Sequence, residues 1–461
     1  MVAFAMSAGM AVPTTERQPK GIYLLCGVEM WERFSYYGMR AFLVLFLISN
    51  DGGWGWSKEH AATLYGFYTG LVYLSSLLGG YLADRFLGTH RAVLMGSAFV
   101  ASGHFCLAFP ARFTFFLGLA LVVLGTGCHK ANISTMVGQL FREKDRRRDS
   151  AFTIFFMGIN MGAMLGPLVC GTLAESARFG WHWGFASAGV GMVLGTGLYV
   201  ILRRRYLGDI GGLPAAGEKP HPGGPSASPI ASQAPLSREE KERIAAIVIL
   251  SFFSVLFFAA FEQAGSSLTF FAKERTDRVI LGMEIKTSYF QSISSLAIVA
   301  FAPVFAALWI KLAARGREPT APIKFASGLT LMASSFAVMV VAAWISDRGV
   351  RVSPWWLVVT YVLMTWAELS VSPVGLSLVC KLAPPRFGSL MMGFWFVALG
   401  LGNLAAGMLA GQVERIERGE VFRLLGGQAD FFLVVFFIAM TAAVALFFLA
   451  NRISRLTHGR A

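Results

Sequence analysis

The sequence predicts an all-α polytopic membrane protein in which twelve transmembrane helices form two six-helix bundles. Of the 461 residues, 55% are hydrophobic and only 14% are charged, and the mean hydropathy is +0.60. Soluble domains carry about 25% charged residues, so the whole chain belongs to the membrane class. Stretches of about 20 apolar residues can cross a bilayer as helices, and a polar segment divides the twelve stretches into six and six.

The predicted spans follow one another with mostly short connections. They cover residues 21–48, 61–84, 92–110, 113–138, 151–174, 183–203, 245–272, 288–312, 324–345, 354–381, 388–412 and 430–451. Only Pro110 to Arg112 separate the third and fourth spans, which predicts a tight helical hairpin at this point.

The longest break between spans has a composition that disfavours packing. It opens with Arg203-Arg204-Arg205, contains six prolines between 214 and 235, and ends in a charged run at 238–241. A segment rich in Pro, Gly, Ser and charge cannot bury a core, so we expect a mobile linker. The expected organisation is an N-terminal tail (1–20), a first bundle (21–203), a linker (204–243), a second bundle (244–453) and a C-terminal tail (454–461).

The basic residues predict the orientation. If the N-terminus is cytoplasmic, 25 Lys and Arg residues fall on the cytoplasmic side and 12 on the other, while Arg33, Arg40 and Lys130 lie inside spans. This asymmetry favours a multi-pass protein with both termini and the linker in the cytoplasm, and the expected location is a bacterial inner membrane. The net charge of +14 is then a consequence of topology, and no nucleic-acid partner is expected.

A polar stripe runs along the first span. Glu29, Glu32, Arg33, Tyr36 and Arg40 are spaced i, i+3, i+4, i+7 and i+11, so they share one face of a helix. A charge near the bilayer centre costs roughly 2.5–3.5 kcal/mol on insertion scales. The stripe therefore predicts a polar, water-accessible interior and a pathway through the membrane.

Three further ionisable residues lie well inside apolar spans, namely Lys130, Glu262 and Glu368. Together with the stripe they make four acids and three bases, so one carboxylate would lack a basic partner if all were ionised. Such a set can hold one proton that leaves when the pairing changes, which is the minimum chemistry of a proton-coupled carrier.

The loop after the second span carries a first family resemblance. Its sequence from Gly80 to Arg91, GYLADRFLGTHR, resembles the G-x-x-x-D-R-x-x-G-x-x-R signature of the major facilitator superfamily. Gly80 and Gly88 would allow close helix approach and a tight turn, and Asp84 would form a breakable latch with basic residues such as Arg85. An ordinary positive loop is the alternative. Two six-helix halves around a polar midplane fit the alternating-access plan of secondary transporters.

The first span carries a second and more specific resemblance. Residues 29–38, EMWERFSYYG, resemble the E-x-x-E-R-F-x-Y-Y-G signature of the proton-dependent oligopeptide transporter family, POT or PTR. Further matches recur in family order at Gly125 to Ser134, Phe261-Glu262-Gln263, Thr276-Asp277-Arg278, Gln291-Ser292 and Glu368 to Gly375. The resemblance spans roughly 21–412 and implies a proton-coupled symporter that imports di- and tripeptides by alternating access.

The resemblance also implies roles for individual residues. It assigns proton coupling to Glu29, Glu32 and Arg33, for which a static ion-pair brace is the alternative, and it adds Glu262. It pairs Arg40 with Glu262 as a gate on the extracellular side. It pairs Lys130 with Glu368 as a second cross-bundle gate lower in the cavity.

A peptide offers a carboxylate, an ammonium group and one or two peptide groups to its carrier. The candidate substrate-binding residues are Tyr36, Tyr37, Arg40, Tyr73, Lys130, Asn160, Ser294, Glu368, Ser372 and Trp395. Arg40 and Lys130 would bind the carboxylate, and Glu368 would bind the amine end. For each aromatic residue, ordinary helix packing is an equally good explanation.

Departures from the family pattern limit the resemblance. Ser294-Ser295 stand where the family often has Asn-Pro, so an amine-end contact and a helix kink are not expected here. Gly66 stands where some members carry a histidine, so we expect no histidine-based proton coupling. The polar linker cannot supply the two extra helices of many bacterial members, which makes this a twelve-helix version.

Two other functions remain to be weighed. The same fold could carry another small solute, such as nitrate or an amino-acid conjugate. A membrane-embedded enzyme is the third possibility, suggested by His129 beside Lys130. It is disfavoured because no second His or acid stands at metal spacing in the sequence and no G-x-S-x-G motif occurs. No metal or other cofactor is expected besides the coupling proton, and one chain in the lipid bilayer should suffice as a monomer.

Overall fold

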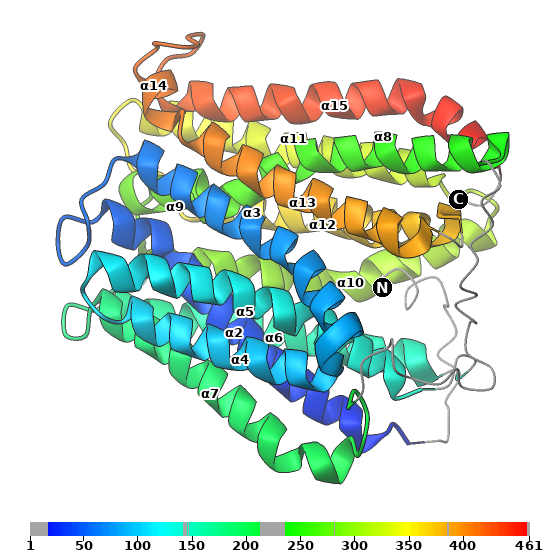
Figure 1. Ribbon diagram of the computed structural model, residues 1–461. Coiled ribbons are helices and arrows are strands. Elements are labelled where there is room, and N and C mark those ends of the chain that lie inside the picture. The colour runs from blue at the N-terminus through cyan, green and yellow to red at the C-terminus, as the bar shows by residue number, and fades with distance from the viewer. Residues whose placement is uncertain are drawn as a thin grey trace.

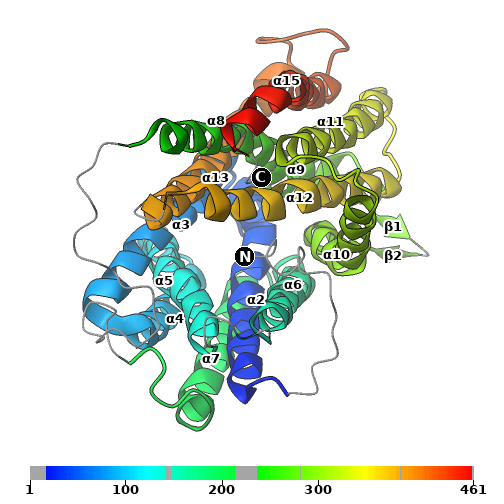
Figure 2. The same ribbon diagram turned by 90° about the vertical axis from the view of Figure 1, so that its right-hand side faces the viewer.

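Figure 1 shows the computed structural model, which describes residues 17–141, 145, 147–212, 236–280, 282–384 and 387–458. The predicted tails at 1–16 and 459–461 and most of the predicted linker, 213–235, lie outside these residues. The described part consists almost entirely of long helices, which form two groups in both views (Figures 1 and 2).

The first bundle contains six long helices. They are α2 (Lys20–Ile48), α3 (Lys58–Leu82), α4 (Gly88–Leu107), α5 (Arg112–Gln139), α6 (Arg147–Ala174) and α7 (Trp181–Tyr206). A π-helical turn, η1 (Ala83–Leu87), joins α3 to α4, and α4 and α5 pack as the predicted hairpin.

The second bundle also has six spanning segments. They are α8 (Arg238–Phe261) with α9 (Ser267–Glu274), α10 (Phe290–Ala314), α11 (Ala321–Ser346), α12 (Trp355–Leu382), α13 (Gly388–Ala410) and α15 (Gln428–Leu456). Smaller elements lie between them: η3 (Glu262–Gly265), the antiparallel strands β1 (Val279–Ile280) and β2 (Met283–Glu284), η4 (Thr287–Tyr289) and α14 (Val413–Glu417).

Each of the twelve predicted spans coincides with a helical segment, which confirms the predicted fold class. By length and composition alone, ten helical stretches of the described chain could cross a membrane, one of which runs from Lys58 to Leu107 through α3, η1 and α4. Helix α2 is not among the ten because it carries the polar stripe. The charged residues of the stripe are thus what separates α2 from these ten stretches.

The polar ends of two spans show why the helices begin where they do. The Ser57 side chain accepts a hydrogen bond from the backbone N–H of His60 at 3.3 Å and caps α3. Ser237 and Glu240 form a capping box at the start of α8, in which each side chain accepts a bond from the other residue's backbone N–H. These bonds satisfy N–H groups that a helix start leaves free.

The seventh predicted span, 245–272, is not one continuous helix. Helix α8 ends at Phe261, the 3₁₀ turn η3 follows, and Ser266 leaves helical geometry with φ −131° and ψ −92° before α9 begins. The Ala264 carbonyl freed by the break accepts bonds from the hydroxyls of Tyr361 at 3.1 Å and Thr269 at 2.9 Å. The break was hidden in the sequence because this stretch is apolar apart from Glu262, Gln263 and a few small polar residues, and contains no proline. The break places Glu262 at the end of a helix.

Several contacts join the two bundles at one of their ends. We call the end where α2 and α8 begin the terminus end, and the end that carries the loop 49–57 the loop end. In the loop half, the Glu175 carboxylate of α6 accepts backbone N–H bonds from Thr287 and Ser288 of η4, both at 2.9 Å, and Lys58 pairs with Glu274 at 2.6 Å. Thr172 of α6 and Tyr289 of η4 add a further hydrogen bond between the bundles at this end, with 2.6 Å between their hydroxyl oxygens.

Small residues let α3 of the first bundle and α13 of the second approach each other closely. A Cβ atom on Gly66 would lie 2.5 Å from the Gly407 Cα, and one on Gly70 would lie 3.0 Å from the Gly400 carbonyl oxygen. Such backbone contact between helices is typical of membrane interfaces, where small residues replace the hydrophobic effect with close packing. Gly66 is therefore a packing residue of the bundle interface.

Candidate functional site

The polar stripe of α2 is buried and internally paired. Glu29, Glu32 and Arg33 have exposed fractions of 2%, 0% and 3%. The Arg33 Nε donates to Glu29 Oε1 at 2.9 Å and lies 2.6 Å from Glu32 Oε2, although the latter contact lacks hydrogen-bond geometry. The i, i+3 and i+4 spacing brings both carboxylates to the one guanidinium.

Helix α5 adds a histidine to this cluster. His129 is fully buried, and its Nδ1 lies 3.8 Å from Glu29 Oε2. Ligand atoms of Glu29, Glu32 and His129 all lie within 4.8 Å of one another, so the expectation that no acid stands near His129 at metal-ligand distance is wrong in three dimensions. The Arg33 guanidinium already balances one of the two carboxylate charges, so a single proton is enough to neutralise the cluster, whereas a divalent metal cation would leave it positive.

A second ion pair connects the two bundles. Arg40 of α2 bonds Glu262 of η3 and also donates to the hydroxyl of Tyr65 on α3. Arg40 and Glu262 are 5% and 3% exposed. The predicted gate pair between them is thus formed, and the break after α8 is what presents Glu262 to α2.

The pair lies at the edge of a cavity of about 190 Å³ between the bundles. The predicted site residues that line it are Tyr37, Arg40, Tyr73, Asn160, Glu262, Ser294 and Glu368. Gln291 and Tyr361 contribute further polar groups, and Phe156, Phe258 and Phe261 contribute apolar surface. One wall therefore carries a guanidinium and another carries the Glu368 carboxylate.

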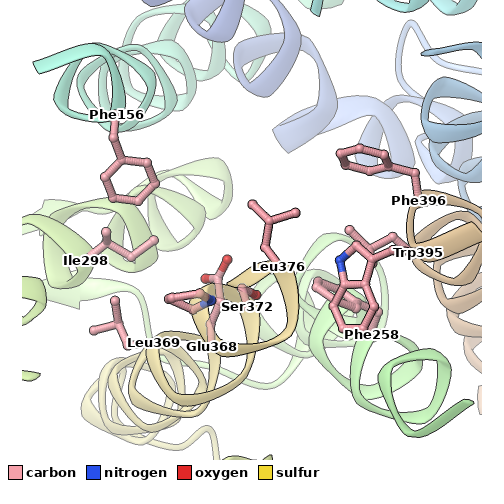
Figure 3. A pocket seen from close by; sticks show the side chains of 11 residues that line it. Phe156, Phe258, Ile298, Glu368, Leu369, Ser372, Leu376, Trp395 and Phe396 are labelled. Atoms are coloured by element: carbon pink, nitrogen blue, oxygen red, sulfur yellow. The ribbon is translucent and has the colours of Figure 1, made fainter. Parts of the chain in front are cut away.

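A second cavity of about 160 Å³ adjoins the first, because Phe156, Phe258, Ile298 and Glu368 line both. In Figure 3, Glu368 and Ser372 lie next to each other on α12, and the rings of Trp395, Phe396 and Phe156 surround the space. Its lining is otherwise almost wholly apolar. The combined chamber thus has a charged part near Arg40 and an apolar part beside Trp395.

The second predicted gate pair is not formed. Lys130 of α5 places its Nζ 4.1 Å from the ring centre of Tyr73. In the described structure neither Lys130 nor Glu368 takes part in an ion pair, so the expected Lys130–Glu368 contact is wrong for this conformation. Tyr73 lines the cavity, so Lys130 contacts a residue of the chamber wall without lining the chamber itself.

The polar interior that the buried charges predict is not one chamber shared by all of them. Tyr36, Lys130 and the trio of Glu29, Glu32 and Arg33 do not line either cavity. Tyr36 packs against Tyr37 and Tyr68, and its hydroxyl has no hydrogen-bond partner in the described part. The site therefore consists of a cavity and a separate buried charge cluster, joined along α2.

The superfamily signature is folded as a turn between helices. Gly80 lies in α3, Asp84 and Arg85 lie in the π-helical turn, and Gly88 has a φ of 74°, which a residue with a side chain rarely adopts. Asp84 is exposed and forms no ion pair with Arg85, Arg91 or another described residue. The predicted latch is therefore not closed in this conformation.

Sequence reasoning missed several residues of the site. Tyr65 contacts the gate and Tyr361 lines the cavity, and each looks like an ordinary helix residue in the sequence. His129 carried a usable signal, because it precedes Lys130 inside an apolar span. Its contact with Glu29 depends on how α2 and α5 pack, which no local pattern encodes.

Comparisons with known proteins agree on one family. A profile of the POT family matches residues 90–209 and 228–424. Peptide transporter YePEPT of Yersinia enterocolitica is 39% identical over 443 residues, which cover 84% of this chain and 86% of that protein. The di-/tripeptide transporter of Lactococcus lactis subsp. cremoris is 33% identical over 435 residues, which cover 83% and 87%.

Solved structures agree with this assignment. The crystal structure of a mutant of peptide transporter POT in complex with alafosfalin is 35% identical, with a TM-score of 0.84 over 99% of this chain and 98% of that one. The similarity confirms the predicted major facilitator fold.

Proposed function

The chain belongs to the POT family, and we propose that it is a proton-coupled symporter that imports di- and tripeptides by alternating access. One observation carries the proposal. The Arg40–Glu262 pair joins the two bundles at the edge of a chamber that also contains Glu368. A charge pair with one member in each bundle can open and close as the bundles move, which a static brace would not require.

The chamber suits a small zwitterion with a variable apolar side chain. Arg40 provides a cationic group for a peptide carboxylate, and Glu368 provides an anionic group for an ammonium. The apolar part beside Trp395 can receive a side chain. If the charged ends supply most of the affinity, many side chains will be accepted. The relatives named peptide and di-/tripeptide transporters support this substrate class.

The cluster of Glu29, Glu32 and Arg33 is the proposed proton-coupling centre. Two carboxylates share one guanidinium, so one negative charge is left over inside the bundle. A proton bound to one carboxylate can neutralise this charge. The proton can leave again when Arg33 changes its carboxylate partner. Substrate and proton sites both include α2, which provides a direct mechanical link between them.

The remaining proposed properties concern location, oligomeric state and chemistry. We propose a multi-pass protein of the bacterial inner membrane with both termini cytoplasmic, which works as a monomer, needs no cofactor besides the proton and catalyses no reaction. The exposed Cys380 near the terminus end of α12 tests the orientation. A membrane-impermeant maleimide should label Cys380 in inside-out vesicles and not in intact cells, and Cys380→Ser should remove the signal. The reverse pattern would overturn the assigned orientation.

Uptake into proteoliposomes tests the function. Purified protein is reconstituted, a labelled dipeptide is added outside, and an acidic-outside gradient with an inside-negative potential is imposed. We expect accumulation that collapses when a protonophore is added and that is lost in Glu32→Gln. Glu59→Gln, which changes an exposed carboxylate in the first turn of α3, is the matched control and should accumulate peptide normally.

Two outcomes would contradict the proposal. Accumulation that does not depend on the proton gradient would remove proton coupling. Inactivity on a library of di- and tripeptides, combined with accumulation of another small solute, would move the assignment to a different cargo.

A further inference from the structure

His129 is a buried polar side chain that folding alone does not explain. Its exposed fraction is 0%, and neither ring nitrogen has a hydrogen-bond partner among the described residues. A buried polar group without a partner is unfavourable and calls for an explanation. His129 differs from the equally buried and unpartnered His104 because a carboxylate oxygen of Glu29 lies 3.8 Å from its Nδ1.

The nearest polar atoms to His129 are themselves incompletely paired. Glu29 Oε2, 3.8 Å from His129 Nδ1, has no hydrogen-bond partner, and neither oxygen of Glu32 has one. Arg33 holds the other oxygen of Glu29 at 2.9 Å. One oxygen of Glu29 is therefore fixed by the guanidinium while the other remains free on the side of the imidazole.

The other helices packed on α5 bring no competing charge to this ring. Where α3 and α4 meet α5 here, glycines form the contacts: Gly79 faces Gly127, and Gly96 faces the His129 backbone. The neighbouring Lys130 directs its ammonium to the Tyr73 ring. In the part of the chain that the structure describes, the charged groups facing His129 are thus the acids and the guanidinium of α2.

The charge count of the cluster leaves room for one proton. With a neutral imidazole, two carboxylates and one guanidinium give a net charge of −1 (two negative, one positive). A proton on Glu29 or on His129 brings the cluster to zero, the favoured state in a low-dielectric interior. The two acceptors are close enough to compete for that proton.

We propose that His129 is a second proton-holding residue of this cluster and exchanges the coupling proton with Glu29. The inference rests on the proposed proton-coupled transport and adds a residue to it. In the exchange, the O–H bond of the Glu29 carboxyl breaks and an N–H bond forms at Nδ1, so carboxylic acid and imidazole become carboxylate and imidazolium. The 3.8 Å separation must shorten by about 1 Å for a hydrogen bond to form, and a shift of Arg33 toward Glu32 would release Glu29 for this movement.

This proposal revises one expectation from the sequence. The glycine at position 66 argued against histidine-based coupling, because it stands on α3 where some relatives carry a histidine. The structure instead brings a histidine to the proton cluster from α5.

Transport of a labelled dipeptide provides the first test. His129→Gln keeps a polar side chain but cannot exchange a proton at neutral pH. We expect proton-driven accumulation to fall at least about fivefold, the low end of coupling between linked sites, with a flatter dependence on external pH. Counterflow of peptide without a gradient should stay within about twofold of the unchanged protein, because it needs no net proton transfer. His104→Gln changes another fully buried, unpartnered histidine outside the cluster and should alter neither assay.

A spectroscopic test separates this inference from the proposed function. In protein labelled with ¹⁵N-histidine, the imidazole signal that disappears in His129→Gln belongs to His129. We expect this signal to shift in Glu29→Gln and to titrate at a different pH there, while the His104 signal stays unchanged. An unchanged His129 signal in Glu29→Gln, or an unaltered pH profile of uptake in His129→Gln, would overturn the proposal. Coupled signals in a protein that accumulates no peptide would leave proton sharing intact and refute the proposed function instead.

Discussion

The two cross-bundle ion pairs expected from the sequence behave differently. Arg40 and Glu262 are joined in the loop half of the interface, whereas Lys130 and Glu368 are separate, with Lys130 against Tyr73 and Glu368 in the chamber wall. The difference matches the distribution of other contacts, since Glu175 and Lys58 also bridge the bundles at the loop end. The structure therefore represents one state of the interface, in which the loop half is joined and the Lys130–Glu368 pair is open.

The comparison shows what a buried charge pair contributes. The free-energy cost of burying two charges is nearly balanced by their attraction, so such a pair adds little net stability. Removing one partner, however, leaves a buried charge without compensation. A pair of this kind suits a switch because it can open without a large change in free energy if each charge finds another partner. Arg40 already has the Tyr65 hydroxyl, and a peptide carboxylate would be a second alternative.

Breaking the formed pair should have the largest effect. Glu262→Gln leaves Arg40 buried without its anion, so we expect a loss of about 3–5 kcal/mol in stability and loss of gradient-driven uptake. Thermal unfolding in detergent and proteoliposome uptake measure the two effects. The double variant with Arg40→Gln should recover much of the unfolding temperature, and a single variant as stable as the unchanged protein would show that the pair is not buried as described.

Changing the unformed pair should affect transport far more than stability. Lys130→Gln removes a cation–π contact worth about 0.5–2 kcal/mol and no ion pair, so the unfolding temperature should fall only slightly. Uptake should nevertheless fall about tenfold or more, because the second gate cannot close. A large loss of stability would indicate that Lys130 is already paired in this state.

The Glu175 contact should have an intermediate effect confined to the loop end. Glu175→Ala removes a carboxylate that accepts two backbone N–H bonds from the other bundle, so we expect a cost of about 2 kcal/mol to this conformation. Hydrogen exchange should rise at Thr287 and Ser288 and stay unchanged at the terminus end. If hydrogen exchange rose equally at both ends of the bundles, the contribution of Glu175 would not be local.

The exposed pair should matter least. Lys58→Met breaks the bond to Glu274, whose side chain is 36% exposed, so we expect a cost of about 0.5 kcal/mol or less. Uptake at physiological salt should remain close to that of the unchanged protein. A loss of stability as large as that of Glu175→Ala would show that the Lys58–Glu274 pair is a main contact between the bundles at the loop end.

The sequence predicted what depends on local spacing and missed what depends on packing. The spans, the hairpin at Pro110 and the pairing within the α2 stripe follow from apolar length and from the helical repeat. Arg40 and Glu262 are far apart in the sequence, and only the family resemblance suggested their contact. The break at Glu262 and the approach of His129 to Glu29 left no periodic signal. The Lys130–Glu368 contact depends on which conformation the bundles adopt.

Distance measurements at both ends of one protein test the central claim, that the bundles alternate between two closures. Spin labels at Arg85→Cys and Leu390→Cys report the terminus end, and labels at Asp51→Cys and Val421→Cys report the loop end, in a chain whose five native cysteines are replaced by serine. When dipeptide is added at acidic pH, we expect a shorter population at the terminus end and a longer one at the loop end. Distances that stay fixed, or that change in the same direction at both ends, would contradict the account.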